Sequence, residues 1–181
     1  MTKHGSQKEL VVHARNQRVF AIDRAQVIGA GFIATAMGTS VLKAESLEIR
    51  GILATMVTLI TPLDRPRALL VGTVWHYLNG IAFAVLYAKI LIVLGKQSTV
   101  TTGFWLGLSL WMILMLMLPI LFSGDPSVRS GQLPNPGAFL LNTGMGWTPA
   151  FFVLLDHLVY GLLVGILYKH HRLLGPESVG R

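Results

Sequence analysis

The stretch "LLDHLVYGLLVGILYKHH", Leu154 to His171, places two titratable side chains, Asp156 and His157, near the start of an apolar segment long enough to enter a membrane. A charged side chain inside hydrocarbon is costly, roughly 2.5–3.5 kcal/mol for an Asp at the centre of a helix. Titratable residues in such a segment therefore indicate either a functional site or a buried structural hydrogen bond. The rest of the sequence bears on which of the two applies.

The composition is typical of an integral membrane protein. Of the 181 residues, 52% are hydrophobic and only 13% are charged, about half the charged fraction of a soluble domain. The net charge of +7 does not indicate nucleic-acid binding, because the basic residues flank apolar segments and form no stripe with interleaved aromatic residues. Their position is typical of topology determinants and anionic-lipid contacts. The absence of cysteine excludes disulfides, thiolate metal sites and cysteine nucleophiles.

The hydropathy pattern predicts an all-α membrane protein in which residues 25–169 form the membrane domain. Residues 1–24 are predicted to be a basic segment in the cytoplasm or at the interface, and residues 170–181 a cytoplasmic tail. Residues 46–62 hold an apolar run that is too short to span, since about 20 residues are needed. We expect this run to form an interfacial helix that lies on the membrane or dips into it. Four transmembrane helices are predicted, at about 25–42, 69–95, 101–122 and 149–169.

The second and fourth predicted spans share an internal repeat. His76 aligns with His157 and Gly80 with Gly161, and Leu and Tyr also recur at matching offsets. The chain is therefore predicted to consist of two repeated helical hairpins. Repeats with an even number of helices run parallel, so the expected architecture is a four-helix bundle in which the two repeats face one another.

Small residues recur every fourth position in the first predicted span, at Ala30, Ala34 and Gly38. Such a ridge allows close approach of a neighbouring helix. We expect these three residues to serve helix packing and not ligand binding.

The distribution of basic residues predicts the topology. Ten of the 15 lysine and arginine residues lie in the N-terminal segment, between the second and third spans, or after the fourth span, and the other five lie in the remaining loops. Basic residues concentrate on the cytoplasmic side. Both termini are therefore expected in the cytoplasm.

The motifs "HLVYGLLVGILY", "NPGAFLLNTGMGW" and "GAGFIATAMGT" resemble a family of small bacterial four-helix integral membrane proteins known only as a domain of unknown function. The resemblance runs from about Ala25 to Tyr168. It implies a helical fold in the bacterial inner (plasma) membrane and implies no reaction. Asp156 departs from the pattern, in which a small residue precedes the His.

Two matched histidines on related helices suggest a haem b site. Imidazole is a common axial ligand of haem iron, and a bundle core can hold such a cofactor. In this interpretation His76 and His157 are the metal ligands, while Gly80 and Gly161 leave room for the porphyrin. No other cofactor is indicated.

Two further interpretations remain open. In the first, both histidines hydrogen-bond to Asn79, Tyr160 or backbone carbonyls, and the matched glycines serve packing. In the second, the intramembrane polar residues Asp156 and Asn79 mark a functional position, with Asp156 and a histidine forming a proton or quinone site.

The sequence contains no H-E-x-x-H, no G-x-S-x-G and no phosphate-binding glycine loop. We therefore expect a non-enzymatic protein, an accessory or assembly subunit of a larger bacterial membrane complex in respiratory or photosynthetic electron transfer. Its expected partners are the lipid bilayer and either other membrane subunits or further copies of itself. A haem b electron-transfer protein is the alternative, and a proton or quinone site is the third option.

Overall fold

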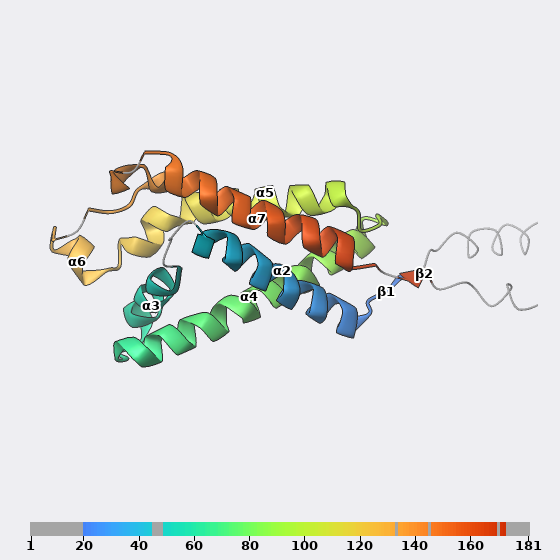
Figure 1. Cartoon of the computed structure of the whole chain (residues 1–181), viewed down its shortest axis with the longest axis horizontal. Helices are drawn as coiled ribbons and strands as arrows, with labels where there is room; N and C mark the ends of the chain where they lie inside the picture. The colour runs from blue at the N-terminus through green and yellow to red at the C-terminus, as the bar shows by residue number, and fades with distance from the viewer. Residues whose placement is uncertain (1–19, 45–48, 133, 145, 170, 173–181) are drawn as a thin grey trace, which may run out of the picture.

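The computed structural model describes residues 20–44, 49–132, 134–144, 146–169 and 171–172 (Figure 1). The predicted segments 1–24 and 170–181 therefore lie largely outside the described residues. The described chain is mainly helical. Its elements are β1 (Phe20–Ala21), α2 (Arg24–Ala44), α3 (Ile49–Ile60), α4 (Arg65–Val93), α5 (Val100–Phe122), α6 (Pro126–Arg129), η1 (Ala138–Thr143), α7 (Thr148–Leu167) and β2 (His171–Arg172).

Three of the described helices, α4, α5 and α7, are long and apolar enough to cross a membrane. They coincide with the second, third and fourth predicted spans. α4 begins at Arg65, earlier than expected, because Asp64 caps it by accepting a hydrogen bond from the Arg67 backbone N–H at 3.1 Å and proline occupies its first turn. Many large apolar side chains on these helices are exposed, as lipid contact requires.

The helix α2 lies between α4 and α7 and packs against both (Figure 1). Ala30 and Ala34 are buried in one core cluster with Tyr160 and Val164 of α7. Near the other end of α2, a Cβ atom on Gly38 would collide with the α7 backbone and side chain. The small-residue ridge thus lies in the contact between α2 and α7.

Within each of the two predicted hairpins, α2 with α4 and α5 with α7, the helices pack through glycines. A Cβ atom on Gly31 of α2 would lie 3.1 Å from the carbonyl oxygen of Gly80 on α4. A Cβ atom on Gly103 of α5 would likewise collide with the carbonyl of Gly161 on α7. The contacts between the two hairpins are not symmetric. α2 contacts α7 extensively, whereas α4 and α5 make no comparable contact in the described chain. The two-fold arrangement of facing repeats stays a prediction.

The shorter elements close one end of the helices. α3 packs on the first part of α4, where a Cβ atom on Gly72 would lie 2.9 Å from the Leu53 backbone. Its 12 residues make a helix of about 18 Å, too short to cross a bilayer. η1 folds back on the protein itself, and the Phe139 ring lies 5.5 Å, centroid to centroid, from the Trp111 ring of α5 in a tilted arrangement. At the opposite end, β1 pairs antiparallel with β2, Phe20 opposite Arg172.

Replacing Ala34 by Leu tests the packing of α2. Ala34 is fully buried, so the larger side chain must push α2 away from its neighbours, at a cost of about 1–3 kcal/mol. The matched control is Ala82→Leu, at an exposed position of α4. Denaturation in mixed detergent micelles, followed by circular dichroism, measures both. Equal stability of the two variants contradicts the packing described here.

Candidate functional site

A cavity of about 480 Å³ lies between α4, α5 and α7, with α2 and α3 contributing to its wall. Most of its lining is apolar. Trp75 and Phe83 of α4 and Ile113 and Met117 of α5 line it and are each at least 40% exposed. The cavity therefore opens on the outer surface between α4 and α5. Its polar lining residues gather on the opposite wall: Thr35, His76, Asn79, Asp156, His157 and Tyr160.

Asp156 is the buried carboxylate of this wall. It is only 7% exposed, and its Oδ1 atom lies directly against Gly38 of α2. Its Oδ2 atom lies 3.2 Å from Nδ1 of His157, the next residue in the chain. The absence of a side chain at Gly38 thus creates the space that the carboxylate occupies.

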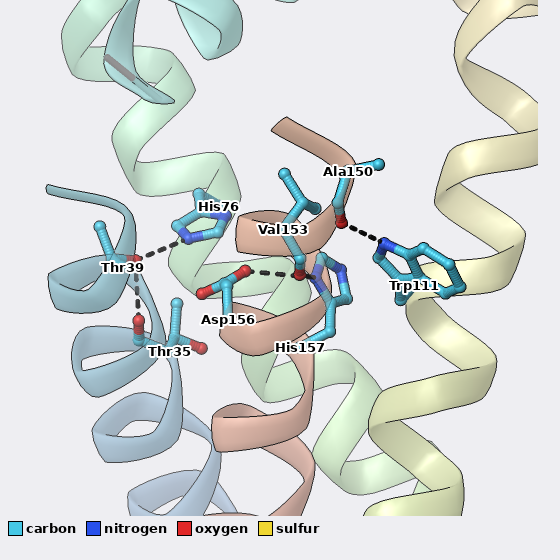
Figure 2. Close-up of polar contacts among 8 residues, drawn as sticks. All are labelled: Thr35, Thr39, His76, Trp111, Ala150, Val153, Asp156 and His157. Atoms are coloured by element: carbon cyan, nitrogen blue, oxygen red, sulfur yellow. Dashed lines mark hydrogen bonds and ion pairs between the residues drawn. The ribbon is translucent and has the colours of Figure 1, made fainter. Parts of the chain in front are cut away.

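His157 faces a different helix from Asp156, as expected from the turn of about 100° between consecutive helical residues. Its backbone carbonyl lies against Gly107 of α5. Its Nδ1 atom also lies 2.8 Å from the carbonyl oxygen of Val153, one turn earlier in α7. The imidazole is therefore held by its own helix and by Asp156 (Figure 2).

His76 is held by α2. Its Nε2 atom lies 3.0 Å from Oγ1 of Thr39, and that hydroxyl donates to the carbonyl of Thr35 at 2.7 Å. Asp156 lies between the two imidazoles (Figure 2). The structure thus brings together His76, His157 and Asp156, three residues from the predicted sites.

Tyr160 links α7 to α4, because its hydroxyl donates to the carbonyl of Gly80 at 2.5 Å. The hydrogen-bond partners expected for the histidines were Asn79, Tyr160 or backbone carbonyls. His157 uses a backbone carbonyl, that of Val153 on its own helix. His76 uses Thr39, which was not among the expected partners. The available signal for this partner was the spacing of Thr35 and Thr39, one helical turn apart on the face of α2 toward α4.

The matched glycines do not open space for a porphyrin. Gly80 lies directly against the Thr35 side chain, and Gly161 lies against the backbone of Gly103 and Gly107. Both glycine faces are thus occupied by a neighbouring helix. The residues around His76 and His157 therefore do not fit the haem predicted from their repeat.

Comparison of the chain with family models, curated proteins and solved structures finds no match. The resemblance to the bacterial four-helix family stays a prediction. The chemistry of the site must therefore be argued from its geometry.

The contact between Gly38 and Asp156 gives a direct test of this geometry. Gly38→Ala should destabilise the protein by about 1–3 kcal/mol, because the new methyl group meets the Asp156 carboxylate. The matched control is Gly29→Ala on the same helix, where a Cβ atom would meet nothing within 4 Å. That variant should be neutral or stabilising, since Ala favours helix by up to about 1 kcal/mol over Gly.

Thermal unfolding of both variants in detergent provides the measurement. Combining Gly38→Ala with Asp156→Ala should recover part of the loss, because the shortened side chain leaves room for the methyl group. A Gly38→Ala variant as stable as Gly29→Ala is incompatible with the placement of Asp156 described here.

A visible spectrum tests the absence of haem. We expect the purified protein to show no Soret band, because the space beside Gly80 and Gly161 is filled. A Soret band that disappears in both His76→Ala and His157→Ala would contradict this interpretation.

Proposed function

We propose that the chain crosses a bacterial inner membrane four times and binds a small lipid-soluble molecule in its lateral cavity. The first point concerns α2. Its 21 residues extend about 31 Å, which is sufficient to cross the hydrocarbon core. α2 runs beside α7 from Gln26, whose Oε1 accepts a hydrogen bond from the Lys169 backbone N–H at 3.2 Å, to Gly38.

The pairing of β1 with β2 supports an even number of crossings. Phe20 precedes α2 and Arg172 follows α7, and the two residues are paired. The two ends of the membrane domain therefore lie on the same side. The excess of basic residues there and in the loop after α4 favours the cytoplasm. In this arrangement α3 lies at the opposite interface.

The observation that carries the functional proposal is the position of Asp156 and two imidazoles on the inner wall of a cavity that opens toward lipid. Ligand pockets are typically 300–1,000 Å³ in volume, mostly apolar, with a few convergent polar groups. The cavity has this size and this lining. Its opening between α4 and α5 suits a molecule that enters from the bilayer, with its polar end toward Asp156 and its apolar part toward the opening.

Of the three functions predicted from the sequence, this proposal develops the site built on Asp156. It is a binding function and requires no catalysis. It is compatible with an accessory subunit, because the opening lies on the exposed apolar surface of α4 and α5, where another membrane subunit or a second copy would dock. A partner seated there would share the ligand.

The topology can be tested with single cysteines, since the natural chain has none. Ser130 follows α6, and Gln97 lies between α4 and α5; both are exposed. An impermeant maleimide added to intact cells should label Ser130→Cys and leave Gln97→Cys unlabelled. The reverse pattern would place both termini outside the cytoplasm.

Binding can be tested with 4-heptylphenol and 4-heptylanisole, two amphiphiles with a ring and an apolar tail. We expect the protein in lipid nanodiscs to bind at least 4-heptylphenol by calorimetry. Ile113→Trp places a larger ring at the cavity opening and should remove this binding. The matched control is Ile120→Trp on the same helix, at an exposed position outside the cavity lining.

The lipid in the wild-type preparation and in both variant preparations takes up the amphiphiles equally. A difference in binding heat between the proteins therefore reports binding in the cavity. Identical heats for the wild type and the Ile113→Trp variant would show that the cavity is not a binding site.

A further inference from the structure

The hydrogen bonds of the site determine which nitrogen of each imidazole carries a proton. The Thr39 hydroxyl has a single hydrogen, and it donates this hydrogen to the Thr35 carbonyl at 2.7 Å. The same oxygen lies 3.0 Å from Nε2 of His76. With its hydrogen on the shorter bond to Thr35, it accepts from that nitrogen, and in this arrangement Nε2 of His76 carries a hydrogen. In a neutral ring, Nδ1 of His76 is then a bare acceptor.

The opposite arrangement holds in His157. Its Nδ1 atom lies 2.8 Å from the Val153 carbonyl and 3.2 Å from the Asp156 carboxylate. Both oxygens are acceptors when the carboxylate is ionised, so Nδ1 must be the donor. In the neutral ring, Nε2 of His157 is the bare acceptor.

These two nitrogens are available to a ligand. His76 and His157 both line the cavity. Neither bare nitrogen has a hydrogen-bond partner among the described residues, and neither is fully buried. The Tyr160 hydroxyl already donates to the Gly80 carbonyl, so it has no hydrogen left to give a ligand.

The polar wall is therefore rich in acceptors. It combines two bare imidazole nitrogens and the Asp156 carboxylate, while the Asn79 amide supplies both donors and an acceptor. A ligand group that carries its own O–H satisfies such a wall, whereas a carbonyl or an ether leaves the acceptors unpaired. A buried polar group left without its partner costs about 1–3 kcal/mol.

We propose that the cavity selects ring compounds that carry a hydroxyl group, of the phenol or hydroquinone class, over their quinone or ether counterparts. This inference rests on the proposed binding function and specifies its ligand. A flat ring suits the remaining lining, which includes Trp75, Phe83 and Phe122 and the adaptable side chains of Met115 and Met117.

The test compares 4-heptylphenol with 4-heptylanisole, which differ only by a methyl group on the oxygen. Calorimetry in nanodiscs at pH 8 keeps an unperturbed imidazole neutral, since its pKa is about 6.5. We expect the wild type to bind the phenol about tenfold more tightly than the anisole, a difference of about 1.4 kcal/mol.

Two variants locate the selectivity. In His157→Asn the amide NH₂ replaces Nδ1 as donor to the Val153 carbonyl, and no acceptor remains at the position of Nε2, because the amide oxygen lies nearer the backbone. In His76→Gln the amide NH₂ replaces Nε2 as donor to Thr39, and the amide oxygen does not occupy the position of Nδ1. We expect the two changes together to reduce the phenol preference to less than about twofold. The anisole affinity should stay the same or rise, because the ring nitrogens that the ether leaves unpaired are gone; retained anisole binding shows that the cavity is intact.

The outcomes separate this inference from the binding function. Equal affinities of the wild type for phenol and anisole, with both lost in Ile113→Trp, would overturn the selectivity and leave the binding function in place. Binding of neither compound would overturn both. A tenfold preference that persists in the double variant would overturn the role assigned to the two imidazoles.

Discussion

The burial of one carboxylate is the constraint on which the arrangement of this membrane domain depends. An ionised Asp in hydrocarbon is tolerated only when it is paired or hydrogen-bonded. Asp156 meets this condition because Gly38 leaves it space on α2 and because His157 lies 3.2 Å away on the same helix. The carboxylate is buried because α2 approaches α7 closely at Gly38, and the small side chains of Ala30 and Ala34 make this approach possible.

The same close packing determines where the cavity lies. Glycines bring α2 onto α4 and α5 onto α7, and α2 also packs on α7, whereas α4 and α5 meet near their connecting loop and diverge from it (Figure 1). The space between them is bounded by the face of α7 that carries Asp156 and His157. The way in which the helices pack therefore gives the cavity its form: it is apolar, it opens laterally, and it has a polar wall at its inner end.

The sequence predicts part of this picture. Hydropathy and length locate α4, α5 and α7, because the cost of exposing backbone polar groups to lipid leaves few alternatives. The cost of burying Asp156 marks the site. For Gly80 and Gly161 the sequence offered two roles, space for a cofactor or close packing of a helix, and the structure places a neighbouring helix against both. Thr39 was missed because threonines in membrane helices commonly bond their own backbone, and only the position of α4 shows that Thr39 also accepts from His76.

Nitrogen-15 NMR of histidine-labelled protein in lipid nanodiscs tests the central claim most directly, since the chemical shifts report which ring nitrogen carries a proton. The chain has six histidines, and His76→Gln and His157→Asn assign the two signals. At pH 8 the account predicts a hydrogen on Nε2 of His76 and on Nδ1 of His157, and it predicts that 4-heptylphenol shifts the two bare nitrogens. The opposite tautomers, or bare nitrogens that do not respond to the phenol, would contradict it.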